Sequence, residues 1–167
     1  MARLANFIYY IRSLRIKNQY DLGNIFAMDE TAVWLDMPGA TTVSPVGEDC
    51  VPVRTTGHEK SRVTVCLTAK ANGVKLPPMI VFKGKQLKRE VANVSGIVPV
   101  MSDNGWMSED LTIKYLQCII GRMTFQKSLL VRHSYQCHIS NAVIQEATSM
   151  KIDMAVIPGG CTGIIQV

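Results

Sequence analysis

An Asn-Gly pair at positions 72 and 73 separates two stretches that both have the composition of β-strands. Residues 61–69 (SRVTVCLTA) are rich in β-branched side chains and alternate in polarity, which is typical of a strand. Asn-Gly is a strong hairpin signal, because both residues readily adopt positive φ angles. Residues 76–82 (LPPMIVF) then form the returning strand, with two prolines at its start, where no ladder donor is lost. The chain is therefore expected to be built around an antiparallel hairpin.

The hydrophobic pattern on either side of this hairpin predicts a mixed sheet. Residues 24–35 contain two short apolar runs broken by Asp29-Glu30-Thr31, so we expect one strand to end near Asp29 and a second short strand to follow. Downstream, strand and helix patterns alternate, which favours parallel strands joined by right-handed crossovers. The further expected elements are a short strand at 97–101, a helix capped by Ser108, a strand at 128–132, a helix at 140–150 capped by Ser140 or Asn141, and a strand at 152–157. This order predicts an α/β fold with a mixed sheet flanked by helices, for which an RNase H-like topology and a generic α/β sandwich are both allowed.

Two segments are expected along the chain, with the boundary between them after residue 23. Residues 1–23 are expected to form an N-terminal amphipathic helix and linker, because their apolar side chains recur at helical spacing with basic residues on the other side. Residues 24–167 then form the main domain, which finishes on a strand and a loop without a further helical pattern. Because a mixed sheet normally carries helices on both faces, we expect this domain to be incomplete at its C-terminus. No apolar run approaches the ~18–20 residues of a membrane span, so no membrane partner is expected.

The positive charge of the chain is concentrated in one segment. The 167 residues carry a net charge of +5, but residues 54–89 hold nine Lys or Arg and one Glu, a net charge of +8, so the rest of the chain carries −3. One interpretation is a solvated hairpin whose Lys and Arg side chains keep an exposed sheet edge from pairing. The other is contact with DNA phosphates, for which KGKQLKR at 83–89 is the best local candidate. Aromatic residues are sparse in this run, so backbone contact with a duplex is favoured over stacking on single strands.

Five stretches together resemble the catalytic domain of pogo/Tigger-type DDE transposases of the mariner superfamily. They are FAMDETAVWLDMPG (26–39), TTGHEKSRVTVCLTAKANGVKLPPMIVFKG (55–84), NGWMSEDL (104–111), SLLVRHSYQCHIS (128–140) and MAVIPGGCTGIIQ (154–166). The resemblance implies an RNase H-like fold, DNA as the partner, a nuclear location and no small-molecule substrate. It also implies three acidic residues that hold two Mg²⁺ or Mn²⁺ ions, since such ions prefer oxygen ligands and a metal pair drives phosphoryl displacement.

The chain departs from this acidic triad at the second position. Asp29 matches the first catalytic and metal-binding acid, while Glu30 and Thr31 are expected to shape a turn. His133 stands at the second acid, and a neutral imidazole is a poor ligand for Mg²⁺ and adds no negative charge. The third acid is expected beyond Val167. We therefore expect Mg²⁺ or Mn²⁺ not to be bound functionally here.

The resulting expectation is a transposase-derived DDE endonuclease-like domain that binds DNA and is catalytically inactive. The residues expected to contact nucleic acid are Lys60, Arg62, Lys83, Lys85, Lys88 and Arg89. Trp34 and Trp106 are expected to be packing anchors. Two alternatives stay open: an active metal-dependent endonuclease whose remaining acid lies in a longer chain, and a domesticated module that binds other nuclear proteins.

Overall fold

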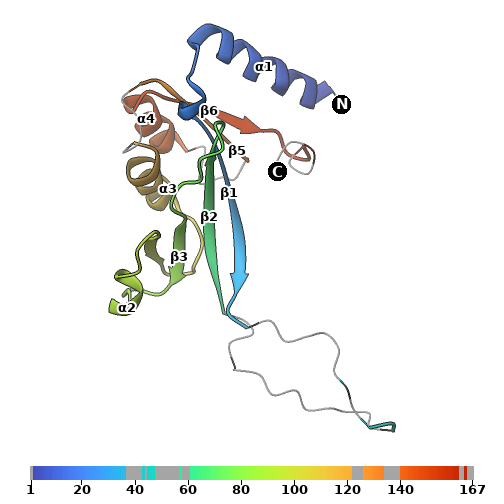
Figure 1. The fold of residues 1–167 in the computed structure, drawn as a ribbon, viewed down its shortest axis with the longest axis vertical. Helices are drawn as coiled ribbons and strands as arrows, with labels where there is room; N and C mark the ends of the chain where they lie inside the picture. The colour runs from blue at the N-terminus through green and yellow to red at the C-terminus, as the bar shows by residue number, and fades with distance from the viewer. Residues whose placement is uncertain are drawn as a thin grey trace.

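The computed structural model describes residues 2–36, 43, 45–47, 57, 61–121, 126–133, 140–161 and 164, and within them a six-stranded sheet is flanked by helices (Figure 1). The strands are β1 (Ile25–Trp34), β2 (Arg62–Lys70), β3 (Met79–Lys83), β4 (Val98–Ser102), β5 (Ser128–His133) and β6 (Ile152–Ile157). The helices are α1 (Ala2–Asn18), α2 (Arg89–Ala92), α3 (Glu109–Tyr115) and α4 (Asn141–Ser149), with a 3-10 turn η1 (Leu22–Asn24) and a π-helical turn η2 (Leu116–Ile120). The strand order is β4-β3-β2-β1-β5-β6, so the predicted mixed α/β sheet is confirmed.

The predicted hairpin is present between β2 and β3. These strands pair antiparallel, and Gly73 takes a φ of +88° in the turn between them. The amide of Lys70 donates to the carbonyl of Val74 at 2.8 Å, which closes the turn. Regular pairing of β3 begins at Met79, directly after the two prolines, as expected for residues that cannot donate to a ladder.

The predicted break at Asp29 is wrong, because β1 is one continuous strand. It pairs antiparallel with β2 from the Phe26–Lys70 pair to the Trp34–Arg62 pair without interruption. Asp29 lies inside this strand, opposite Leu67. The polar run was taken for a turn on local composition, but long-range pairing with β2 satisfies its backbone groups and overrides that preference.

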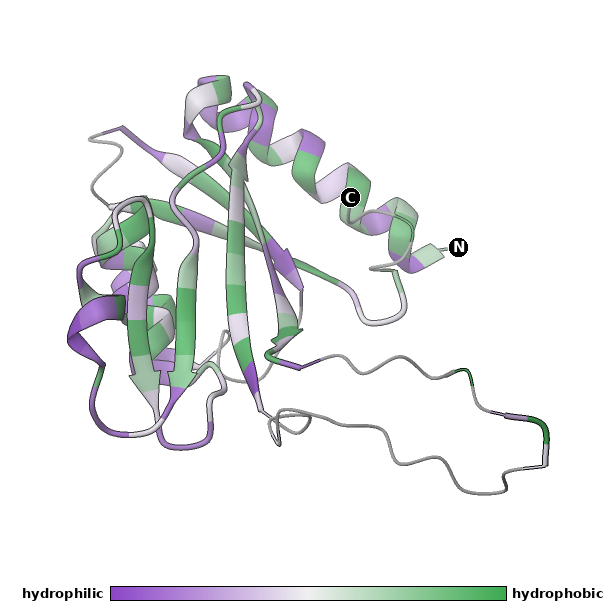
Figure 2. Ribbon diagram, turned by 60° about the horizontal axis from the view of Figure 1, so that its bottom comes forward, coloured by the Kyte–Doolittle hydropathy of each residue, from purple (hydrophilic) through white to green (hydrophobic). Residues whose placement is uncertain are grey.

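The second half of the sheet is parallel, as the alternation of strands and helices predicted. β5 pairs parallel with β1, β6 with β5, and β4 with β3. Consequently β1, β3, β4, β5 and β6 all end on one side of the sheet, where β2 begins, and we call this side the carboxyl end. Figure 2 shows hydrophilic residues in the loops that follow β3 and β4 there. The parallel addition of β4 to β3 was not predicted.

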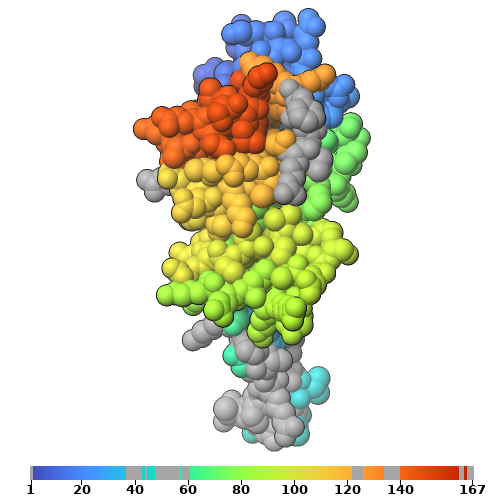
Figure 3. Space-filling model, turned by 90° about the vertical axis from the view of Figure 1, so that its left-hand side faces the viewer, coloured from blue at the N-terminus to red at the C-terminus, as the bar shows by residue number. Residues whose placement is uncertain are grey.

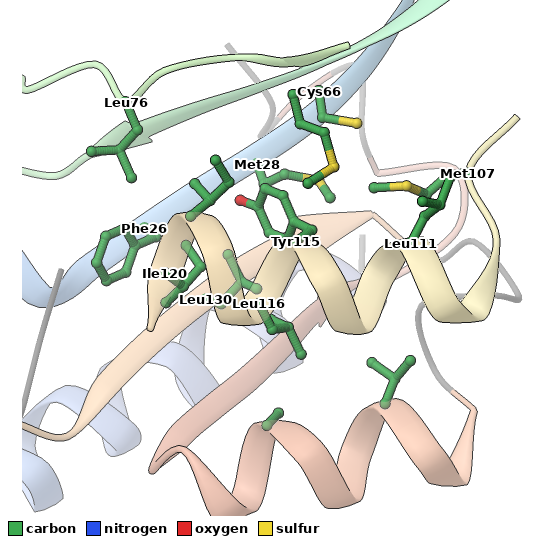
Figure 4. Packing of buried hydrophobic residues seen from close by; sticks show 14 of the residues in the cluster. Phe26, Met28, Cys66, Leu76, Met107, Leu111, Tyr115, Leu116, Ile120 and Leu130 are labelled. Carbon is green, nitrogen blue, oxygen red and sulfur yellow. The ribbon is translucent and has the colours of Figure 1, made fainter. Parts of the chain in front are cut away.

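One face of the sheet is covered by α3 and α4, which form part of the surface seen in Figure 3. Tyr115 and Leu116 are fully buried there and pack against Phe26 and Met28 of β1 and Leu130 of β5 (Figure 4). Both predicted helix caps are confirmed. The hydroxyl of Ser108 accepts from the amide of Leu111 at 3.3 Å, and that of Ser140 accepts from Val143 at 3.4 Å.

The opposite face is covered by α1 over β5 and β6. Phe7 is buried against Leu129, Ala155 and Ile157, so the N-terminal helix shares a core with these strands. Across β1 and β2 the same face is more open, and Leu67 is 52% exposed. None of the helices in the described ranges is both long and apolar enough to cross a membrane.

Candidate functional site at the carboxyl end of the sheet

Two carboxylates of β1 converge on an imidazole at the end of β5. The parallel pairing of the two strands runs as far as Met28 and Arg132, which brings the next residues, Asp29 and His133, alongside each other. Nδ1 of His133 lies 3.5 Å from Oδ1 of Asp29, and Nε2 of His133 lies 3.5 Å from Oε2 of Glu30. The Asp29 side chain is 52% exposed, whereas those of His133 and Glu30 are 22% and 11% exposed. The predicted pair Asp29 and His133 is therefore in contact, with Glu30 as a third member.

This arrangement does not fit a pair of Mg²⁺ ions. Mg²⁺ requires near-octahedral oxygen coordination, but here the imidazole lies between the two carboxylates with a ring nitrogen facing each. A neutral imidazole offers a single lone pair, and an imidazolium offers none. Asp29 is also engaged by its neighbour, because the amide of Glu30 donates to Oδ1 at 2.8 Å. Among the described residues, no three His, Cys, Asp or Glu side chains are grouped to hold a metal ion.

A cavity of about 180 Å³ opens beside these residues. Its lining residues are Glu30, Thr31, Ala32, Thr64, Trp106, Met107 and His133. The hydroxyl of Thr64 donates to the carbonyl of Gly105 at 2.9 Å, which ties the loop after β4 to β2. Glu30 and His133 thus form one part of the cavity wall, and Trp106 forms another.

A buried polar cluster lies beneath the site. The hydroxyls of Thr68 and Tyr115 share a hydrogen bond of 2.7 Å. Burial raises the pKa of the Tyr115 hydroxyl above its ordinary value, while the hydrogen bond from Thr68 and the charge of Arg132 oppose the rise. Arg132 is fully buried, and its Nη2 donates to Sδ of Met154 at 3.3 Å. A charged side chain thus stands in the core directly before His133.

The structure divides the basic segment between the two ends of the sheet. Arg62 begins β2 and Lys83 ends β3, so both lie at the carboxyl end. Lys85, Lys88 and Arg89 follow β3, and Figure 1 places α2 beside the end of that strand. Lys70 and Lys75 lie at the opposite end, around the hairpin turn. Lys60 falls outside the described residues. Lys83, Lys85, Lys88 and Arg89 at the carboxyl end are exposed, and so is Lys75 at the hairpin turn.

Arg62 lies against the two tryptophans of the chain. Its Cζ is 3.6 Å from the ring centroid of Trp106 and 5.6 Å from that of Trp34. Both tryptophans are 44% exposed, so their prediction as packing anchors is wrong. Trp34 is the last residue of β1, and Trp106 lies in the loop between β4 and α3.

The sequence of residues 60–167 matches the profile of a family described as DDE superfamily endonuclease. The chain belongs to this family. It is also 32% identical over 169 residues to proteins named "Pogo transposable element with KRAB domain" of Mus musculus and Homo sapiens. The match covers 99% of this chain and 28% of those relatives, so the chain spans less than a third of their length. The resemblance to pogo-type DDE transposases is therefore confirmed.

Solved structures of Mos1 transposase share the fold of this DDE domain. The Mos1 strand transfer complex gives a TM-score of 0.54 at 13% identity, covering 95% of this chain and 41% of that one. The Mos1 mariner paired end complex with Mn gives 0.56 at 12% identity, with 93% and 41% covered, and the complex with Mg gives 0.52 at 13% identity, with 94% and 41% covered. These matches confirm the predicted RNase H-like architecture.

Sequence reasoning missed two features of the site. Glu30 was assigned to a turn, yet its carboxylate faces His133 from a continuous strand. A strong β-forming run, VWL, after the polar triplet was the available signal that the strand continues. The meeting of Trp34, Trp106 and Arg62 was also missed, because it depends on the β1–β2 register and on a loop far along the chain.

Proposed function

We propose that this DDE domain binds DNA through its phosphates and does not cleave it. Two features of the structure support the proposal, one for each of its halves. One is a group of exposed cations, and the other is a site in which His133 stands between Asp29 and Glu30.

The cations support the DNA-binding half of the proposal. Lys83, Lys85, Lys88 and Arg89 are exposed, and in the part of the chain that the structure describes no carboxylate pairs with them. Unpaired surface cations release the counterions of DNA on binding, which gives affinity without sequence preference. The related Mos1 structures include a paired-end complex with a left transposon end. We also propose a nuclear location, where such a partner is found.

His133 supports the second half of the proposal. Metal-assisted phosphoryl displacement needs oxygen ligands whose negative charge compensates the positive charge of two divalent metal ions. Here an imidazole fills the space between the two carboxylates. The donor set of this site therefore does not suit the metal pair.

The proposal is tested by the salt dependence of DNA binding in matched variants. Fluorescence anisotropy of a labelled duplex gives Kd at several salt concentrations for the unmodified domain, for Lys85→Gln/Lys88→Gln and for Lys70→Gln/Lys75→Gln. The two variants remove the same charge from the same basic segment but at opposite ends of the sheet. We expect the first to weaken binding and to reduce the slope of log K against log salt by about 2, and the second to change neither.

Two results would contradict the proposal. Equal losses in both variants would show that net charge, and not the carboxyl end, attracts DNA. Absence of any salt-dependent binding would favour the module that binds nuclear proteins. Circular dichroism and urea unfolding of each variant confirm that the fold is retained.

A further inference from the structure

The outer side of α1 exposes large apolar side chains together with a cation. Tyr9 and Ile16 are 76% and 79% exposed, and Arg12 is exposed as well. At about 100° per residue, these three side chains fall within one narrow sector of the helix, opposite the buried Phe7. We call this sector the outer stripe of α1 (Tyr9, Arg12 and Ile16).

The helix carries positive charge only. Its 17 residues include no Asp or Glu, and its cations, all of them exposed, are Arg3, Arg12, Arg15 and Lys17. Within the described ranges, no carboxylate lies at ion-pair distance from any of the four. Arg15 and Lys17 stand in the last turn, where the helix dipole favours cations. Arg12 is outside that turn, so the dipole does not account for its position on the outer stripe.

The inner side of α1 holds the helix against the sheet without help from the outer stripe. Phe7 packs with Leu129, Ala155 and Ile157 of β5 and β6. At the end of the helix, the side-chain amide of Asn18 donates to Asp153 at 3.3 Å and its oxygen accepts from Lys127 at 2.9 Å. A partner that binds the outer stripe therefore meets a helix that is already ordered, which lowers the entropic cost of binding.

The spacing of the outer stripe is that of a helix-recognition surface. Single exposed apolar side chains are normal on protein surfaces. Here, however, Tyr9 and Ile16 lie seven residues and about 10.5 Å apart along the same side of one helix. Amphipathic helices present their anchor side chains at this spacing when they bind a partner. Tyrosine and arginine are also the residue types enriched at the centres of protein interfaces.

The order of residues on the stripe indicates the chemistry of the partner. Helices that lie in a membrane interface keep their cations on the side opposite to the apolar residues, whereas Arg12 lies between Tyr9 and Ile16. DNA would use the cations but would leave Ile16 without an apolar contact, since duplex binding is dominated by phosphates. An acidic amphipathic helix offers both apolar side chains and carboxylates, so it matches every residue of the stripe.

We propose that the outer stripe of α1 is a docking surface for an acidic amphipathic helix of a partner protein. Apolar side chains of the partner cover Tyr9 and Ile16, and its carboxylates pair with Arg12 and with the cations beside the stripe. The surface is independent of the proposed DNA-binding function. Figure 1 shows α1 and α2 at opposite ends of the sheet, so a partner on α1 leaves the cations of the carboxyl end accessible.

The proposal is tested with a synthetic peptide of about 20 residues, long enough to form a helix. The fluorescein-labelled probe carries leucine and phenylalanine on one helical side and glutamate elsewhere. One control peptide has the same composition in an order that forms no apolar side, and a second has lysine in place of every glutamate. By fluorescence anisotropy, we expect the domain to bind the probe at least about 10-fold more tightly than either control.

Two variants separate the apolar and charged parts of the surface. Tyr9→Ala/Ile16→Ala removes both anchors and is expected to raise Kd for the probe by about 10- to 100-fold. Arg12→Gln/Lys17→Gln is expected to raise Kd by about 3- to 10-fold and to weaken its dependence on salt. Alanine and glutamine are both good helix formers, so the helix is expected to be retained, and urea unfolding midpoints check this.

Matched control variants carry the same kinds of change away from α1. Leu22→Ala truncates an apolar residue that is 50% exposed in η1. Lys70→Gln/Lys75→Gln removes two positive charges near the hairpin turn. Both controls are expected to bind the probe as the unmodified domain does, and losses equal to those of the α1 variants would overturn the proposal.

The other possible occupants of the surface give distinct results. Unchanged probe binding in Tyr9→Ala/Ile16→Ala would overturn the proposal. So would binding of phosphatidylserine vesicles in place of the probe, or weakened duplex binding in Arg12→Gln/Lys17→Gln, which would assign α1 to lipid or DNA. Self-association in sedimentation that is lost in Tyr9→Ala/Ile16→Ala would identify a second copy as the occupant and overturn it too. Failure of duplex binding alone would overturn only the DNA-binding proposal.

Discussion

The hydrogen bond between Thr68 and Tyr115 lies under the candidate site and provides a test of the packing there. The two hydroxyl oxygens are 2.7 Å apart, Tyr115 is fully buried and Thr68 is 5% exposed. Removing one hydroxyl leaves the other buried without this partner, which costs about 1–3 kcal/mol. Tyr115→Phe and Thr68→Val are each expected to lower the free energy of unfolding by that amount.

The double variant is expected to lose less than the sum of the two single changes. Removing both hydroxyls together leaves neither stranded, so the coupling free energy in a double-mutant cycle should be about 1 kcal/mol. Urea unfolding followed by far-UV circular dichroism measures all four proteins. Tyr9→Phe, at a tyrosine that is 76% exposed, is the matched control and should change stability by less than about 0.5 kcal/mol. Additivity of the two core variants within about 0.3 kcal/mol would refute the reasoning.

Two further predictions concern α1 and high pH. Burial, together with the hydrogen bond to Asp153, raises the pKa of Tyr20, and burial raises that of Tyr115, so both stay protonated above pH ~10, where unfolded tyrosines ionise. The free energy of unfolding is therefore expected to be retained below pH ~10 and to fall above it. Urea unfolding at pH 9 and pH 11 should show a smaller fall in this free energy for Tyr20→Phe than for the unmodified domain. Asp153 accepts from Tyr20 and, at 3.3 Å, from Asn18, and it pairs with Lys127 at 3.0 Å. Asp153→Asn should cost about 1–2 kcal/mol and speed amide hydrogen exchange in α1, and unchanged exchange would contradict this anchoring role.

Features encoded by neighbouring residues were predictable from the sequence. Ser108 and Ser140 are followed by helical patterns, and both act as caps because a cap needs only residues within one turn. The hairpin at Gly73 was equally local. The alternating order of strands and helices restricted the second half to parallel pairing, and the family resemblance selected the RNase H-like form of this sheet.

Features that depend on distant segments were not predictable in the same way. The polar residues around Asp29 indicated a break, but β2 pairs along the whole of β1. The contact of Glu30 with His133 requires the register between β1 and β5. The contacts of Arg62 with Trp34 and Trp106 require a loop after β4 to approach the start of β2. Such tertiary contacts leave no periodic signal in the sequence.

The basic segment also combines a feature that was predictable from the sequence with one that was not. Composition located the excess charge at 54–89, and the structure then separated it into a carboxyl-end group and a pair at the hairpin turn. The excess charge that composition showed is therefore now assigned to particular lysine and arginine side chains.

The most direct test of the account is a plasmid-nicking assay with Mn²⁺, performed at a salt concentration where anisotropy shows that the domain is bound to DNA. We expect the bound supercoiled plasmid to remain intact, because His133 lies between the carboxylates of Asp29 and Glu30. Nicking by the unmodified domain that is abolished in Asp29→Ala would contradict the account and identify a working nuclease.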